Sequence, residues 1–379
     1  MTTGILVNSY SGQPGVTELS LDSDAGRLPR KDYVEMWRRY GVEIIDSTYL
    51  ARRGSPLSRA VARVAGVDLG QLCEAILGGG RYDSLWTWNE SVGLPLALFN
   101  KVTRRQQDLV TVAAWLSRPK KAVFLHPLGA HSAIRAVVTG SRAQLDIAAG
   151  RLGVPRSKLH YAPWPVDERF WQPQEVAVEP MICAVGWEAR DYITLLRAAR
   201  RLAVDVCLAV GSHVLSWNED DGGTAGGGRS RLQALRGTHG YEHYRSWLRH
   251  VADEGLPTNV SLLEQLAPPQ LRDLYGRARL VVVPLHDVDS DCGITAIIEA
   301  MAMGKAVIVT RTRGQVDVFD DGVHGIYVPP YDSPALEAAI NRLLADPQEA
   351  EKMGRAGRRL VESRHALDHY VDQLGALLV

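Results

Sequence analysis

Short apolar runs alternate with amphipathic stretches along this chain, and the alternation occurs in two separate series. The runs have the length of buried strands, and the stretches between them have the spacing of helices. Alternation of this kind predicts parallel sheets with helices on both faces. Because it occurs twice in 379 residues, a length that usually exceeds one hydrophobic core, the sequence predicts two doubly wound α/β domains.

Each predicted strand is an apolar run bounded by polar or turn-forming residues. In the first half of the chain these runs cover residues 5–9, 43–45, 84–88, 109–113 and 136–139. In the second half they cover residues 181–185, 206–210, 260–263, 280–283 and 306–310. Helical spacing is clearest over residues 190–202, 268–277 and 334–344.

Four prolines between the two series indicate a connector; they are Pro163, Pro165, Pro173 and Pro180. Proline disfavours helix continuation and stiffens an extended segment. We therefore predict an N-terminal Rossmann-like domain over 1–165, a linker over 166–180 and a C-terminal Rossmann-like domain over 181–362. A helix over 363–379 is expected to pack back on the first domain.

Composition narrows the class of protein. An apolar fraction of 46% and a charged fraction of 23% are ordinary for a globular domain. No apolar run approaches the ~18–20 residues that span a bilayer, and no segment has the pattern of a secretory signal. The cysteines (Cys73, Cys183, Cys207 and Cys292) lack the spacing of a zinc site or a disulfide framework. We therefore expect a cytoplasmic protein without a bound metal.

The charges are balanced overall but unevenly placed. Lys and Arg outnumber Asp and Glu in residues 1–175, and the reverse holds in residues 176–379. A basic first half suits an anionic acceptor or a peripheral contact with a membrane surface, but ordinary charge scatter between two halves that attract each other is the favoured explanation. No dense basic stripe is present, so we expect no nucleic-acid partner.

A glycine-rich stretch over residues 217–230 contains a near-match to a phosphate-binding P-loop, from Gly223 to Ser230. A P-loop needs a strand feeding directly into it and a Lys that reaches the phosphates. Here the approach is acidic, and Arg229 stands in place of the Lys. The stretch is therefore interpreted as a surface insertion rather than a nucleotide triphosphatase site.

The segment from 289 to 310 carries the clearest chemistry. A predicted strand ends at Pro284, an acidic loop follows, and Gly293 opens a helix-like run. Free N–H groups at a helix N-terminus, together with the helix dipole, form an anion site. Gly293 allows close approach to the backbone, and Thr295 adds a hydroxyl donor. This chemistry suits a diphosphate.

Two acids and a cysteine lie close to that helix start. Glu299, one to two turns further on in an apolar run, is placed to accept hydrogen bonds from a ribose; the alternative is a bond to backbone or an Arg. Asp291 lies on the expected sugar side, or is a plain N-cap or loop Asp. Cys292 has a lowered thiol pKa if the helix N-terminus dominates, and is otherwise an ordinary buried Cys.

Several motifs in order resemble family 4 of the retaining glycosyltransferases, which have the GT-B fold. They are Asp291-x7-Glu299 with AMAMGKAVIVT after it, Gly314 through Asp321-Gly322 to GIYVPPYD (325–332), ICAVGWEARDYITLLRAAR (182–200) and VVTGS…RLGVPRSKLHYAPWPVDERFW (137–171). The resemblance covers residues 84–365 and is strongest over 180–345. It implies two Rossmann-like domains that face a central cleft.

The resemblance also implies donor-site residues. The resemblance implies that Arg190, which follows Gly186 at the end of a strand, contacts the donor diphosphate. A guanidinium can neutralise a phosphate without a metal ion. The alternative is that Arg190 pairs with Asp191 at the surface. The phosphates lie on the backbone of Gly293, Ile294 and Thr295. Glu299 then binds the ribose, Asp291 faces the sugar, and Gln265 lies near the nucleobase.

The sequence departs from the family pattern at three places. Asp291 stands where the family usually has the longer Glu, which affects the sugar contact. Residues 8–12 replace a Gly-Gly loop, and Ala114-Trp115 replaces a common His. Acceptor contacts are expected from Asn89, Glu90 and Trp115 at the ends of first-domain strands, although aromatic residues at such places are more often core.

The function that the resemblance implies is retaining, metal-independent transfer of a sugar from a nucleotide diphosphate donor to an unknown acceptor, with no further cofactor. A sugar-nucleotide epimerase of the same fold and a non-catalytic nucleotide-sugar-binding partner are the alternatives. Hydrolytic motifs of the Gly-x-Ser-x-Gly and HExxH types are missing.

Overall fold

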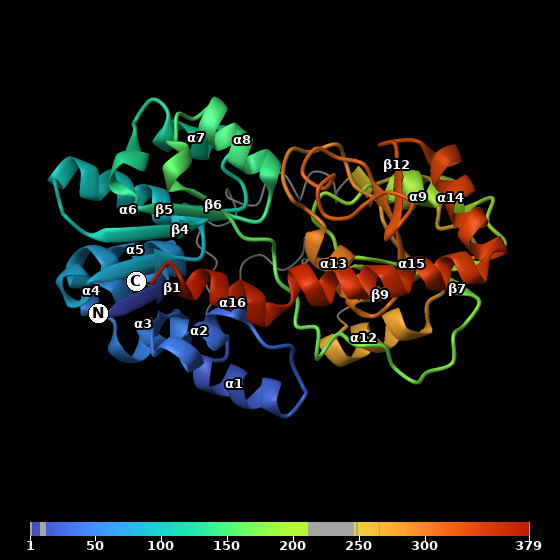
Figure 1. Ribbon diagram of the computed structural model, residues 1–379, viewed down its shortest axis with the longest axis horizontal. Helices are drawn as coiled ribbons and strands as arrows, with labels where there is room; N and C mark the ends of the chain where they lie inside the picture. Colours follow the sequence, from blue (N-terminus) through green and yellow to red (C-terminus); the bar gives the residue numbers. More distant parts are fainter. Residues whose placement is uncertain (1, 8–12, 211–245, 248, 265, 379) are drawn as a thin grey trace.

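Two six-stranded parallel sheets, each covered by helices, make up the molecule in a computed structural model (Figure 1). The structure describes residues 2–7, 13–210, 246–247, 249–264 and 266–378. The strand orders are β2-β1-β3-β4-β5-β6 in the N-terminal sheet and β12-β11-β10-β7-β8-β9 in the C-terminal sheet. The predicted pair of doubly wound domains is therefore confirmed.

The N-terminal domain is built from six strands and eight α-helices in its described part. The strands are β1 (Thr3–Leu6), β2 (Glu43–Ile45), β3 (Ser84–Thr87), β4 (Asp108–Val112), β5 (Ala136–Thr139) and β6 (Leu159–Tyr161). The helices are α1 (Val16–Asp24), α2 (Asp32–Tyr40), α3 (Ser47–Arg53), α4 (Pro56–Ala65), α5 (Val67–Gly78), α6 (Glu90–Thr103), α7 (Pro119–Leu125) and α8 (Arg142–Gly150).

The C-terminal sheet follows the same plan. Its strands are β7 (Met181–Val185), β8 (Asp205–Val210), β9 (Val260–Glu264), β10 (Leu280–Val283), β11 (Ala306–Thr310) and β12 (Gly325–Val328). The helices named along this half are α9 (Tyr192–Ala199), α12 (Pro268–Arg277), α13 (Ile294–Ala302), α14 (Ser333–Ala345), α15 (Pro347–Leu360) and α16 (Leu367–Gly375).

Burial explains which strands the sequence shows. β5, β7, β10 and β11 are fully buried apolar runs, and their bounds match the predicted ones. Two edge strands were not predicted. β6 is only partly buried, and β12 begins at a glycine, so neither has the unbroken apolar pattern of a central strand.

The chain crosses between the domains twice, and the crossings touch. On the first crossing, Val166 forms a parallel bridge with Ala366 of the returning chain. α16 then packs on the N-terminal domain, where Leu367, Tyr370 and Val371 join the core around β1 and β4. In Figure 1 this last helix continues from the end of α15 and lies beside α2 of the N-terminal domain.

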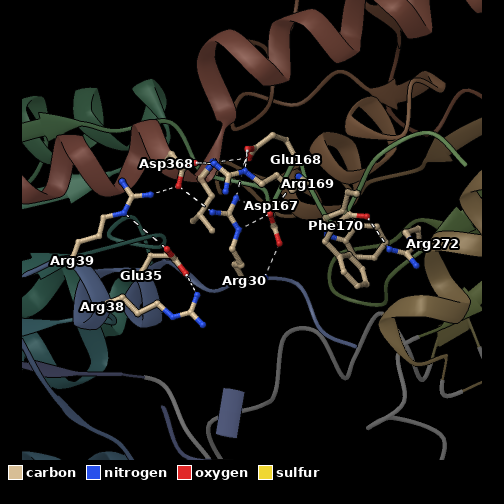
Figure 2. A network of polar contacts seen from close by, with 12 residues as sticks. Arg30, Glu35, Arg38, Arg39, Asp167, Glu168, Arg169, Phe170, Arg272 and Asp368 are labelled. Carbon is tan, nitrogen blue, oxygen red and sulfur yellow. Dashed lines mark hydrogen bonds and ion pairs between the residues drawn. The ribbon is translucent and has the colours of Figure 1, made fainter. Parts of the chain in front are cut away.

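An ion-pair network ties these crossings together (Figure 2). Arg30, just before α2, bonds Asp167 of the first crossing at 2.8 Å and Asp368 of α16 at 3.1 Å. Arg39 of α2 and Arg169 of the first crossing also pair with Asp368. Three segments that are distant in sequence are thereby held at one point between the domains.

Membrane-spanning character is missing from the part of the chain that the structure describes. None of its helices combines the length and apolar character needed to cross a bilayer. The cytoplasmic location stays a prediction.

Candidate active site

A cavity of about 720 Å³ lies between the two domains, at the carboxyl ends of their strands. Ligands of open parallel sheets bind at this end, because the loops and helix N-termini gather there. The N-terminal domain, the connector and the C-terminal domain all contribute to its wall. The lining includes Lys31, Asp32, Trp88, Asn89, Glu90, Ala114, Trp115, Lys121, Trp164, Glu188, Asp291, Cys292, Gly293, Ile294 and Thr295.

The start of α13 forms one wall of this cavity. Gly293 is its N-cap residue, and its φ of 92° is a backbone conformation that residues other than glycine rarely adopt. Ile294 N–H bonds the carbonyl of Asp291 at 3.2 Å and closes the turn into the helix. The next N–H groups of the first turn have no acceptor within the helix, so they and the dipole favour an anion here.

Arg190 lies next to this helix start. Its guanidinium donates to the carbonyls of Val185, at 2.8 Å, and Glu188, at 2.9 Å. A Cβ atom at Gly186 would overlap its Nη2, and one at Gly293 would lie 3.2 Å from its Nη1. The two glycines therefore leave the space that the guanidinium occupies.

The alternative role for Arg190, a surface pair with Asp191, is wrong. Asp191 is the N-cap of α9, and its carboxylate accepts from the N–H of Thr194 at 3.1 Å. Arg190 itself is buried, with 6% of its surface exposed. Its charge is fixed beside the amino end of α13 rather than at the surface.

Glu299 faces inward from the second turn of α13. Its carboxylate accepts a hydrogen bond from the Tyr275 phenol at 3.2 Å. Burial raises the pKa of Glu299 to about 8, and the bond from Tyr275 and the charge of Arg190 only partly offset this. Neither expected alternative, a backbone bond or an Arg pair, is the contact that the structure shows.

Asp291 is among the buried acids of the cavity wall, and it is not an N-cap, since Gly293 has that position. The indole N–H of Trp164 donates to its Oδ2. Burial raises the pKa of Asp291 to about 7, and the nearby Glu90 and Glu188 add to that shift. This acid therefore exchanges its proton near neutral pH.

Cys292 is an ordinary buried cysteine. Burial raises the pKa of its thiol to about 11, and Ser290 Oγ lies 3.2 Å from its sulfur. The lowered pKa expected from its position beside the helix start is wrong, because desolvation of the thiolate and the charge of Glu188 both raise the pKa.

The three acceptor candidates all line the cavity, and each also has a contact within the N-terminal domain. Asn89 caps α6 by accepting from Ser91 N–H. Glu90 pairs with Lys121 and accepts from Ala114 N–H at 3.2 Å. These contacts hold three segments of the domain together.

Trp115, the third acceptor candidate, lies under two cations. Arg118 and Lys121 lie 4.6 Å and 5.4 Å from the centre of its ring. Cation–π contacts of this kind fix the ring at the cavity wall.

Sequence reasoning missed several residues of the cavity. Asp32 accepts from the indole N–H of Trp88 at 2.8 Å, and burial raises its pKa against that bond. Lys31 beside it has a pKa lowered by burial. Their run, RLPRKDY, has only the pattern of a helix start, so no local signal distinguishes them from capping residues.

Several residues predicted from the sequence to belong to the site do not line this cavity or lie outside the described residues. Of the described residues, Gly186, Arg190 and Glu299 are not part of the cavity lining. Gln265, the near-match to a P-loop over 223–230, and residues 8–12 lie outside the described residues. In the part of the chain that the structure covers, no three His, Cys, Asp or Glu side chains gather as metal ligands do.

Comparison with known proteins shows which sequences and structures this chain resembles. Residues 239–360 match the family model described as Glycosyl transferases group 1. An alpha-D-kanosaminyltransferase from Streptomyces kanamyceticus is 29% identical over 127 residues, 34% of this chain and 32% of that protein. A D-inositol 3-phosphate glycosyltransferase from Segniliparus rotundus is 36% identical over 103 residues, 27% of this chain and 22% of the relative. The matches thus span about a third or less of these relatives' own lengths.

Likeness in structure extends over the whole chain. The crystal structure of HepE from Anabaena in complex with UDP and glucose superposes with a TM-score of 0.67 at 15% identity, and the match covers 100% of this chain and 99% of that one. At such identity the likeness establishes the fold. The chain has the GT-B fold, and its C-terminal domain carries the sequence pattern of glycosyl transferases group 1.

Proposed function

We propose that this chain is a glycosyltransferase that moves a sugar from a nucleotide diphosphate donor to an acceptor hydroxyl. One observation carries the proposal: the buried guanidinium of Arg190 and the amino end of α13 converge at Gly293, beside the cavity. A fixed cation and a set of free N–H groups at one point suit a diphosphate. The group 1 match, which includes α13, supports the same function.

The other donor contacts follow from the direction of α13. In this proposal Glu299, one to two turns beyond Gly293, accepts hydrogen bonds from the hydroxyls of the ribose. Asp291, on the opposite side of the helix start, contacts the sugar. UDP is the first nucleotide to test, because HepE, which shares the fold, is described in complex with UDP.

The chemistry needs stabilisation of negative charge on the departing phosphate. Arg190 and the N–H groups of α13 are preorganised for this, and preorganised charges of this kind usually lower the barrier more than any other catalytic effect. We propose transfer with retention, in which the leaving phosphate accepts the proton of the acceptor hydroxyl on the same face of the sugar. That route needs neither a metal ion nor a separate protein base.

The acceptor is proposed to bind against the N-terminal wall of the cavity. Asn89, Glu90 and Trp115 lie on this wall, and their contacts within the domain hold them in place before an acceptor arrives.

The test has two stages. A thermal-shift screen against UDP, GDP, ADP and TDP identifies the nucleotide, and the matching nucleotide sugars are then incubated with the purified chain. Slow hydrolysis of the sugar nucleotide supports a transferase, and an isomerised sugar would instead make the chain an epimerase. Binding without either reaction, even with candidate acceptors, would favour a non-catalytic partner.

A further inference from the structure

Trp164 occupies the place where both interdomain crossings meet. It follows β6 on the first crossing, and its carbonyl lies 2.9 Å from Nδ1 of His365 on the second. Two residues on, Val166 pairs with Ala366. The indole ring packs against the cores of both domains. Its position therefore depends on how the two domains are arranged.

The polar edge of this ring points at the cavity. Its Nε1–H donates to Oδ2 of Asp291, across 127 residues of sequence. Asp291 is 6% exposed and comes from the C-terminal domain, whereas Trp164 follows β6 on the first crossing between the domains. The bond thus joins the first crossing to an acid of the cavity wall.

Gly140, just after β5, makes room for this arrangement. A Cβ atom there would overlap the indole of Trp164. Its φ is not positive, so the backbone of Gly140 also accepts alanine, and only the space for the ring requires glycine. The N-terminal domain therefore contributes a specific fit for Trp164.

Two acids near Asp291 act against the bond from Trp164. Glu90, from α6, and Glu188, from the loop after β7, both face it and disfavour its ionised form. Lys121 of α7, which also lines the cavity, is paired with Glu90. The indole N–H is the side-chain donor that favours the ionised form of Asp291, and it also sets its direction.

We propose that Trp164 is a positioning residue: its indole N–H holds the carboxylate of Asp291 in the cavity, and its place on the first crossing ties that carboxylate to the domain arrangement. The contact stands on the geometry alone. Only its consequence for sugar transfer rests on the proposed function.

The contact is tested first without any substrate. In the wild-type chain, the ¹⁵N indole resonance of Trp164, assigned by its loss in Trp164→Phe, shifts with pH about a midpoint near the pKa of Asp291, about 7. In Asp291→Asn it loses that titration, while the indole of Trp88, which donates to Asp32, keeps its own response. A Trp164 resonance that is flat with pH, or that titrates unchanged in Asp291→Asn, overturns the proposal.

Two further variants separate positioning from general packing. Gly140→Ala displaces the indole without touching Asp291, so the midpoint read from the ¹³Cγ signal of Asp291 rises, as in Trp164→Phe. Gly150→Ala is the matched control, because a Cβ atom at Gly150, at the end of α8, meets open space. If Gly140→Ala titrates like Gly150→Ala, the indole does not set the state of Asp291, and the proposal fails.

The catalytic consequence is tested with the nucleotide sugar found by the screen. Trp164→Phe is expected to lower kcat by about 10- to 100-fold, the range for losing one hydrogen bond to a charged group. The acidic limb of the pH profile moves to higher pH, and the Kd for the nucleotide diphosphate changes less than about twofold. An unchanged pH profile overturns the catalytic role. Failure of the wild-type chain to bind any nucleotide would contradict the proposed function instead, and would not affect the NMR result.

Discussion

The phenol of Tyr275, on α12, donates a hydrogen bond to the carboxylate of Glu299, on α13, at 3.2 Å. The bond crosses from one helix to its neighbour and occupies one oxygen of an acid whose pKa burial raises to about 8. The second oxygen has no partner among the described residues. A donor with two adjacent hydroxyls, such as a ribose, complements that arrangement.

Removing the carboxylate tests this directly. Glu299→Ala is expected to weaken binding of the nucleotide diphosphate by about 10²-fold, because two hydrogen bonds to a charged group are lost. Tyr275→Phe is the matched control: it removes the phenol, keeps the carboxylate, and should change affinity less than about tenfold. Calorimetry on both variants, with circular dichroism to check folding, decides the matter. Wild-type affinity in Glu299→Ala would rule out the ribose role.

The raised pKa of Glu299 predicts a pH dependence. Free protein holds a proton on this acid below about pH 8, and a ribose that donates two hydrogen bonds favours the ionised form, so binding must release that proton. Affinity should therefore rise from about pH 7 to about pH 9 and level off above the pKa. Calorimetry in buffers of different ionisation enthalpy measures the released proton. Glu299→Gln should abolish the release; a release that persists there would come from another group.

Arg190 is expected to act mainly on the reaction step. Arg190→Ala should slow transfer by about 10²–10³-fold, the range for losing one preorganised donor to a developing anion. Arg190→Lys keeps the charge but not the fork that bonds Val185 and Glu188, and should recover part of the rate. Steady-state kinetics with the identified donor measures both. Equal rates for the wild type and Arg190→Ala would exclude the residue from catalysis.

Asn89 offers a prediction about stability. Because its side chain caps α6, Asn89→Ala should lower the free energy of unfolding by about 1 kcal/mol, and Asn89→Ser should restore most of it. Urea denaturation of the three proteins measures the difference. Were Asn89→Ala as stable as the wild type but impaired in its KM for acceptor, Asn89 would be an acceptor ligand and not a cap.

Much of the architecture follows from local patterns in the sequence. Central strands such as β7 and β10 are unbroken apolar runs because both of their faces are covered, and that pattern is local. The Gly293 turn into α13 was equally visible, since a loop, a glycine and an apolar helix follow one another in sequence. The turn and helix start on which the proposed diphosphate site rests therefore needed no tertiary information.

Which side chains meet follows only from the packing of distant segments in the folded chain. Trp164 and Asp291 are 127 residues apart, and nothing local to either one indicates that the indole N–H will donate a hydrogen bond to that carboxylate. Glu299 was visible as an acid within an apolar run, but its partner Tyr275 depends on where the fold places α12 relative to α13. Local propensity fixes strands and helix starts, whereas hydrogen-bond partners and desolvation arise only when separate segments are packed together.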